Sequence, residues 1–235
     1  MSNLTIKRFN QQDPRLGRNQ VHDERSRGFV AARPTVDRST WHDHSIRIYD
    51  PLPNPNQTVG NCTMCAKAMQ HNAVGNRQKG VILDMAWAMR TYEWETANDQ
   101  FPGAYKPGDP NSQDTGSSGL ASCKTAQHEG TGGEYRWEFE GADGVVQNIM
   151  AGRVISVGTR WDWNMFEQDS RGLIQLGGGE AGGHQYIYRG YDLDRDELIG
   201  RCWWGVFRDF RISRANADEL LRDGGDAHYQ ERLLK

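Results

Sequence analysis

One stretch of the sequence decides the fold, and it reads Asn56-Gln57-Thr58-Val59-Gly60-Asn61-Cys62-Thr63-Met64-Cys65-Ala66. From Cys62 onward the apolar residues recur every three to four positions, which predicts a helix that begins near this cysteine. A helix N-terminus lowers the pKa of a thiol, because its unpaired N–H groups and its dipole favour the thiolate. Gly60 allows the sharp turn that would expose the thiol. Cys62 is therefore a candidate nucleophile.

A histidine far downstream is the candidate partner of this thiol. His184 follows Gly182-Gly183 and opens an alternating, strand-like segment that runs to Tyr191. An imidazole can take the thiol proton and hold the charge as an ion pair, and Gln57 can donate to an oxyanion together with the backbone N–H of Cys62. A lone cysteine or histidine in such a place is more often structural. Their combination in this order and spacing is typical of a cysteine hydrolase.

The composition limits the class of protein. The 235 residues fit one large domain or two closely joined lobes, and they suffice for a sizeable core. A net charge of −3 favours neither nucleic acid nor a membrane surface as a partner. The sequence shows no signal peptide and no apolar run near the roughly 20 residues of a membrane span, so the localisation stays unknown. Four cysteines are too few for a disulfide scaffold, so we expect free thiols.

The order of the expected elements indicates an α+β protein. Residues 1–55 are expected to form an N-terminal arm and a strand that packs on a β lobe. Residues 56–150 should form a mainly helical lobe that carries Cys62, and residues 151–235 a mainly β lobe that carries His184. The two lobes are expected to make one structural unit.

Finer predictions concern single elements. A second helix is expected to start at Ile82, and a third at Asp114-Thr115-Gly116-Ser117-Ser118, whose hydroxyl and carboxylate groups would cap it. Residues 173–176 should form a strand. His42 and His44 form an H-x-H pair around Asp43, but no further ligand follows at a metal-site spacing. A solvated strand edge is the better interpretation, and we expect neither a metal nor a cofactor.

Several stretches, taken together, match the pattern of one family. They are His22-Asp23-Glu24-Arg25-Ser26, Asp114-Thr115-Gly116-Ser117-Ser118-Gly119-Leu120-Ala121, Val157-Gly158-Thr159-Arg160-Trp161 with Met165-Phe166, Ala181-Gly182-Gly183-His184, and Glu219-Leu220-Leu221-Arg222-Asp223-Gly224-Gly225-Asp226. With the stretch around Cys62, which partly matches the family's D-Q-G-x-x-G-x-C-T-G-N-A, the chain resembles papain-like (C1-type) cysteine peptidases. The match is best to the compact versions encoded by actinobacterial bacteriophages and some bacteria. The resemblance covers nearly the whole chain. It implies a helical lobe packed on an antiparallel β-barrel-like lobe, with the site in the cleft between them.

The resemblance also assigns roles to residues. It makes Cys62 the nucleophile, His184 the general base and Gln57 the oxyanion donor. Cys65 is the rival nucleophile, favoured by a papain-style Q-G-x-C-G-S-C reading. However, Gly60-Asn61-Cys62-Thr63 fits the phage pattern better, and Cys65 lies one helical turn further on, where its thiol should face the core.

Three departures from the family pattern put the activity in question. The spacing from Gln57 to Cys62 is one residue short, and Asn56 replaces the usual aspartate. The family's N-S-W-G, whose Asn orients the histidine, is missing. One count places Cys202 at the Asn position and another places Arg201 there. A thiol is a weak hydrogen-bond partner and Arg has no acceptor, so neither can act as the Asn does. Both weak activity and no activity fit the sequence.

Two functions follow from the resemblance. The first is a cysteine peptidase-like hydrolase of peptide or amide bonds that works through an acyl-enzyme and is weakened by the lost Asn. Its substrate would be a peptide or protein, including a virion or host protein or a cell-wall peptide. The alternative is a catalytically inactive papain-like domain that serves as a structural or binding component of a phage particle, at its tail or tail tip. The resemblance places the chain in a phage virion or in the cytoplasm of an infected bacterium.

Overall fold

The computed structural model describes residues 4–7, 13–31, 36–49, 57–74, 80–204 and 209–231. Asn56 lies outside the described residues. The α-helices are α1 (Cys62–His71), α2 (Met85–Asn98), α3 (Gly119–His128), α4 (Gly141–Met150) and α5 (Arg214–Arg222), and the 3-10 helices are η1 (Glu24–Phe29), η2 (Arg38–Thr40) and η3 (Trp163–Phe166). The strands are β1 (Leu4–Lys7), β2 (Gln20–Asp23), β3 (His44–Ser45), β4 (Tyr135–Glu138), β5 (Ile155–Asp162), β6 (Glu180–Asp192), β7 (Glu197–Arg201), β8 (Asp209–Ser213) and β9 (Asp226–Gln230). Within the described ranges, no helix is long and apolar enough to cross a membrane.

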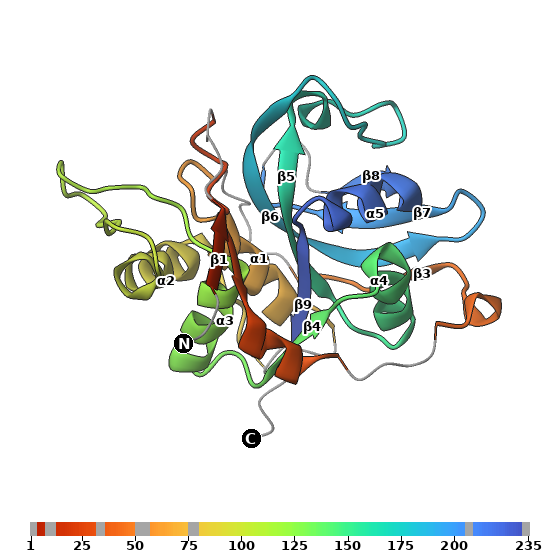
Figure 1. Cartoon of the computed structure of the whole chain (residues 1–235), viewed down its shortest axis with the longest axis horizontal. Coiled ribbons are helices and arrows are strands. Elements are labelled where there is room, and N and C mark those ends of the chain that lie inside the picture. The colour runs from red at the N-terminus through yellow and green to blue at the C-terminus, as the bar shows by residue number, and fades with distance from the viewer. Residues whose placement is uncertain are drawn as a thin grey trace.

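One antiparallel sheet of seven strands forms the β lobe in the described part of the chain. Its order is β4-β9-β5-β6-β7-β8, and the short β3 pairs with β6. β6 is the long, curved strand in Figure 1, and its register with β5 places His184 opposite Thr159. His184 therefore lies on the central pair of strands.

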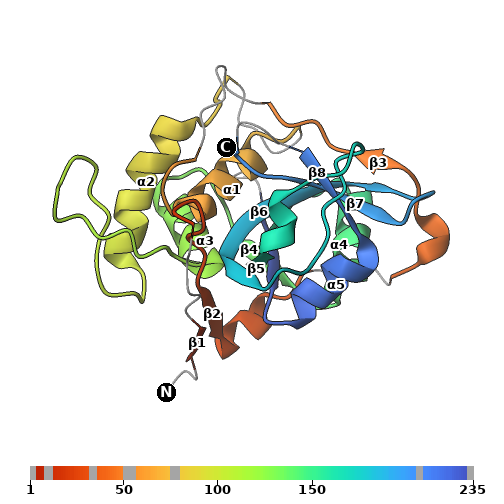
Figure 2. The same ribbon diagram turned by 90° about the horizontal axis from the view of Figure 1, so that it is seen from above.

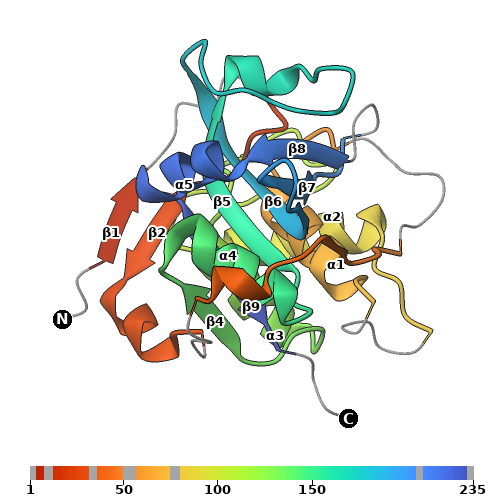
Figure 3. The same ribbon diagram turned by 90° about the vertical axis from the view of Figure 1, so that its right-hand side faces the viewer.

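The helices lie on two sides of this sheet. α1, α2 and α3 pack together on one side, and α4 and α5 pack on the other (Figures 1 and 2). Figure 3 looks from the second side, where α4 and α5 lie in front of β5. Each side has its own buried apolar cluster, so both faces of β6 are covered. Ile187 packs in the cluster of α1 and α2, whereas Tyr186 and Tyr188 pack in the cluster of α4 and α5.

Two helices start later than their sequence patterns predict. α2 begins at Met85 rather than Ile82, because the Asp84 side chain accepts from the Trp87 N–H and caps the helix. α3 begins at Gly119, because Ser118 caps it by accepting from the Ala121 N–H. The carboxylate expected to cap that helix, Asp114, makes a tertiary contact instead.

The strand expected over residues 173–176 is reduced to a single bridge between Leu173 and Arg211. Ile174 is fully buried, so the apolar pattern reflects core packing rather than a strand ladder. The range expected for the helical lobe also holds β4 and α4. β4 pairs with β9, and α4 packs on β6 and α5, so both elements lie with the sheet.

Candidate active site

The turn before α1 is fixed by polar contacts from distant elements. The Gly60 N–H donates to Asp114 Oδ2 at 2.7 Å, and the Tyr92 hydroxyl donates to Asp114 Oδ1 at 2.6 Å. Asn61 precedes the helix without capping it through its side chain. Asp114 therefore holds the turn that sets where Cys62 starts the helix. Sequence reasoning assigned Asp114 to a helix cap, because nothing local points from it to Gly60.

Cys62 begins α1 and its side chain is completely buried. The backbone N–H groups of Gln185 and Gly17 donate toward its sulfur. Burial nevertheless raises the pKa of the Cys62 thiol to about 12, because removing a thiolate from water costs more than these donors return. In this arrangement the thiol is protonated at neutral pH.

His184 is held by aromatic rings. Its ring stacks on Trp204 at 4.4 Å between centroids and meets the edge of Trp161 at 4.9 Å. Neither ring nitrogen has a hydrogen-bond partner among the described residues, so the ring is not hydrogen-bonded to the Cys62 thiol. Burial first, and the Arg15 guanidinium second, lower the pKa of His184 to about 3. The imidazole is therefore neutral, and the sulfur instead contacts the residue that follows it, Gln185.

Gln57 connects the two lobes. Its Oε1 accepts from Trp204 Nε1 at 3.2 Å, and its backbone N–H donates to the Trp203 carbonyl. Its Nε2 donates to two backbone carbonyl oxygens, of Arg15 at 2.7 Å and of Val59 at 2.9 Å. The amide predicted to bind an oxyanion thus holds a peptide carbonyl oxygen.

The Arg15 carbonyl belongs to residues 13–19, which we call the cleft segment. The Gly17 carbonyl accepts from the Ser117 N–H at 2.7 Å, and the Arg18 N–H donates to the Gly183 carbonyl at 3.0 Å. Gly17 also lies directly on Gly60, where an added Cβ would overlap the Gly60 carbonyl. The cleft segment therefore passes between the residue before His184 and the turn before Cys62, and it covers both.

Sequence reasoning missed the cleft segment. Arg15 lies over the rings of Trp204 and Phe166, at 4.8 and 5.2 Å from the guanidinium carbon, and Leu16 is fully buried in the core. The segment has no periodic pattern, and its place depends on contacts with residues far along the chain. The feature that marks this segment locally is a glycine, Gly17, between buried neighbours. Burial cannot be read from the sequence, so this feature could not identify the segment in advance.

Neither residue at the family's Asn position orients His184. Arg201 points to Asp209, with which it makes two hydrogen bonds of 2.7 and 3.2 Å. Cys202 is buried, and burial raises the pKa of its thiol. Trp204, which follows Cys202 by two residues as W follows N in N-S-W-G, stacks on His184. The stacking favours the count that places Cys202 at the Asn position.

The rival nucleophile lies in the core. The Cys65 thiol donates to Asn61 Oδ1 at 3.6 Å and packs in the apolar cluster of α1 and α2. Burial raises its pKa well above the usual value. The position one helical turn after Cys62 accounts for this placement.

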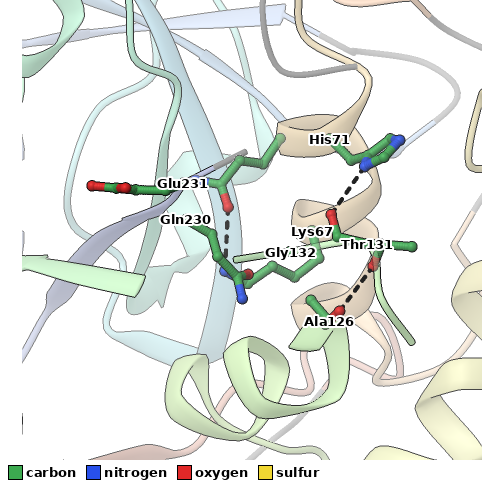
Figure 4. Close-up of a pocket in the computed structure, with 8 residues that line it drawn as sticks. Lys67, His71, Ala126, Thr131, Gly132, Gln230 and Glu231 are labelled. Atoms are coloured by element: carbon green, nitrogen blue, oxygen red, sulfur yellow. Dashed lines mark hydrogen bonds between the residues drawn. The ribbon is translucent and has the colours of Figure 1, made fainter. Parts of the chain in front are cut away.

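A small cavity lies near the other end of α1, and Figure 4 shows its lining residues Lys67, His71, Ala126, Thr131, Gly132, Gln230 and Glu231. Its volume of about 20 Å³ suits about one water molecule. It is too small for a peptide. No group of three or more His, Cys, Asp or Glu residues in the described ranges could hold a metal ion, and all four cysteines are free thiols.

Comparison with known proteins places the fold. No protein-family model matches the sequence, and no curated protein matches it significantly. Among solved structures, xylellain, a cysteine protease from Xylella fastidiosa, has a TM-score of 0.69 at 14% identity over 98% of this chain and 100% of that chain. Procathepsin B S9 from Trypanosoma congolense has a TM-score of 0.56 at 9% identity, covering 92% and 86%. A C39-like peptidase from Bacillus anthracis has a TM-score of 0.51 at 13% identity, covering 83% and 100%.

At such low identity the likeness concerns the fold alone. The chain has a mixed fold of helices and an antiparallel sheet that matches papain-like proteases, which confirms the predicted fold class. The roles of Cys62, His184 and Gln57 remain predictions.

Proposed function

We propose that the chain is a cysteine peptidase-like hydrolase of peptide or amide bonds that works once the cleft segment leaves the site. The observation that carries the proposal is the bond of 2.7 Å from Gln57 Nε2 to the Arg15 carbonyl. The amide assigned to an oxyanion already binds a peptide carbonyl oxygen, in a segment that also contacts the Cys62 sulfur and the residue before His184. A polypeptide backbone therefore fits between these groups.

The reaction would follow the acyl-enzyme route. The Cys62 sulfur bonds to the carbonyl carbon while His184 takes the thiol proton, and Gln57 Nε2 and the Cys62 N–H donate to the oxyanion. The C–N bond then breaks, and His184 gives the proton to the leaving amine. Water hydrolyses the thioester, its oxygen stays on the acyl product and a proton returns to Cys62. A neutral thiol and a neutral imidazole are the inert starting state of this sequence.

The cleft segment explains that inert state. Burial is the main cause both of the raised pKa of Cys62 and of the lowered pKa of His184. Removing the segment admits water, and it takes away both the Arg15 guanidinium, which lowers the pKa of His184, and the Asp13 carboxylate, which opposes this smaller effect. The pKa of the thiol then falls and that of the imidazole rises, which favours the ion pair. Without the Asn, aromatic rings rather than a hydrogen bond hold the His184 ring in the described structure, so we expect a rate below that of a complete triad.

The second candidate is a catalytically inactive papain-like domain. The observation that favours it is the unbonded His184 ring together with Cys202 at the family's Asn position. In that case the cleft would serve for docking in a phage particle, at its tail or tail tip. The phage association, for either candidate, rests on the family-like stretches of the sequence.

Thiol labelling separates the two candidates. Gly17→Ala should expel the cleft segment, because its Cβ would overlap the Gly60 carbonyl. Gly28→Ala is the matched control, since a Cβ there has no neighbour within 4 Å. We expect iodoacetamide to label Cys62 in Gly17→Ala rapidly below pH 7, and His184→Ala in that background to abolish the effect. Labelling no faster than that of a free thiol, in a folded Gly17→Ala protein, would favour the inactive domain.

A further inference from the structure

The Arg18 side chain of the cleft segment fills a pocket beside the candidate site. It is completely buried, and its Nη2 donates to Asp226 Oδ2 at 2.6 Å and to the Gly224 carbonyl at 3.2 Å. Its backbone N–H donates to the carbonyl of Gly183, the residue before His184. The backbone of Arg18 therefore lies beside Gly183, and its side chain reaches the carboxylate of Asp226 at the start of β9.

Two glycines make room for this side chain. A Cβ on Gly158 would come within 2.6 Å of Arg18 Nε and 2.5 Å of Gln185 Oε1. A Cβ on Gly119 would come within 3.0 Å of Asp226 Oδ1 and 2.9 Å of His228 Cε1. Any larger residue at Gly158 would narrow the space that the guanidinium occupies. The pocket is thus shaped by backbone on one side and by a carboxylate on the other.

The acceptors of the pocket suit a guanidinium. Asp226 Oδ1 is buried and has no hydrogen-bond partner in the described part of the chain, so this carboxylate can accept from a second N–H. His228 Nδ1 lies 3.9 Å from it, but burial and the charges of Lys67 and Arg18 lower the pKa of His228 well below its usual value. The imidazole is neutral and adds no positive charge beside Asp226, so the Arg18 guanidinium is the cation that pairs with this carboxylate. A carboxylate that is mostly removed from water is stabilised by a cation, and a planar fork of N–H donors matches its geometry best.

We infer that the cleft selects an arginine side chain of its polypeptide substrate through the pocket that Asp226 closes, and that Arg18 is the internal stand-in for it. The inference rests on the proposed function, since it names the substrate class of the same cleft. Asp226 is then the residue that determines specificity. A purely structural ion pair would need no place in the cleft, whereas Arg18 sits one residue after Gly17, which lies on the turn before Cys62.

Peptide binding tests the pocket without any catalysis. The protein used is the full chain with Gly17→Ala and Arg18→Ala, which vacates the cleft and the pocket. Its ligands are blocked peptides that copy residues 13–19, with arginine, citrulline or lysine at the sixth position, and calorimetry measures the dissociation constants. Citrulline keeps the shape of arginine and lacks its charge. We expect arginine to bind at least about tenfold tighter than citrulline, because a buried charged hydrogen bond is lost.

The variants assign the preference to one carboxylate. Adding Asp226→Asn should bring the arginine-to-citrulline ratio close to one. Adding Asp223→Asn is the matched control, because the Asp223 carboxylate is exposed and pairs with Arg160, and the ratio should persist. Equal binding of the two peptides, or a preference that survives Asp226→Asn, would overturn the inference.

A second measurement covers the case in which the double variant does not fold. Arg18→Ala alone should be stabilised by methylguanidinium, with a rise in melting temperature that N-methylurea does not give and that Asp226→Asn abolishes. Equal effects of the two additives would overturn the pocket. Arginine selectivity without a reactive Cys62 would contradict the hydrolase and leave the pocket standing, whereas a reactive Cys62 without selectivity would remove the pocket alone.

Discussion

The two sides of the candidate site hold Cys62 and His184 in different ways. On the helical side, hydrogen bonds fix the turn before Cys62: the Gly60 N–H donates to the Asp114 carboxylate, and the Cys65 thiol donates to Asn61 Oδ1. On the sheet side, the ring nitrogens of His184 have no hydrogen-bond partner among the described residues, and the ring packs against those of Trp161 and Trp204. The departure at the family's Asn position falls on the sheet side. The helical side therefore fixes the position of the Cys62 thiol with hydrogen bonds. The sheet side positions the His184 ring by packing, without a hydrogen bond that decides which ring nitrogen carries the proton.

The largest expected effect is on acid unfolding, and it belongs to the histidine side. Folding lowers the pKa of His184 from 6.5 to about 3, so the unfolded chain binds this proton more tightly. The contribution to stability is complete above about pH 6.5 and is lost as the pH falls toward 3, by on the order of 5 kcal/mol. Urea unfolding across this range should show a shallower loss in His184→Phe. Parallel curves for the two proteins would contradict the buried neutral imidazole.

The Cys62 thiol should affect the free energy of unfolding in alkaline rather than acid solution. Folding raises the pKa of Cys62 from 9.0 to about 12, so the unfolded chain loses this proton first. The contribution is complete below pH 9 and is lost as the pH rises toward 12, by on the order of 4 kcal/mol. Cys62→Ala should lose less stability than the natural chain as the pH rises above 9 by the same urea method. An unchanged alkaline slope would show that the thiol is more hydrated than its burial indicates.

The turn before Cys62 offers a smaller, local test. Asp114→Ala leaves the Gly60 N–H and the Tyr92 hydroxyl without their acceptor, which should cost about 2 kcal/mol of unfolding free energy. Asp194→Ala, at an exposed carboxylate, is the control and should change little. If Asp114→Ala is as stable as the control, the hydrogen bonds on the helical side do not fix the turn.

The smallest expected effect comes from supplying the missing partner of His184. In the Gly17→Ala background, Cys202→Asn should raise the rate at which iodoacetamide labels Cys62 at pH 6 by about tenfold, since an oriented imidazole takes the thiol proton more often. Cys123→Asn, at a buried thiol that contacts Lys67, is the control and should give no gain. Equal rates in the two variants would mean that ring stacking by Trp204 already orients His184.

Local patterns in the sequence were enough for the fold class and for the elements that carry the candidate pair. Cys62 begins a helix and His184 lies on a strand, as the three-to-four-residue and alternating patterns predict. The start of α2 was misplaced because the cap at Asp84 outweighs the apolar pattern that begins at Ile82. The prediction of a strand at residues 173–176 was wrong. A buried apolar residue, here Ile174, gives the same sequence pattern whether or not its segment forms a hydrogen-bonded strand.

The occupant of the cleft could not be predicted, because its place depends on tertiary contacts. Gly17 meets Gly60, and Arg18 meets Gly183 and Asp226, across long stretches of chain. Asp114 was assigned to a cap for the same reason, since its actual partner, Gly60, precedes a different helix. Local periodicity reports how an element is built. It does not report which segment covers it.

We infer that the cleft segment keeps Cys62 and His184 in an inert protonation state. The most direct test is an NMR titration of the His184 imidazole, labelled with nitrogen-15, in the natural chain, in Gly17→Ala and in the control Gly28→Ala. We expect His184 to stay neutral down to about pH 3 in the natural chain and the control, and to titrate at or above its usual pKa of 6.5 in Gly17→Ala. The same low pKa in a folded Gly17→Ala protein would contradict the claim.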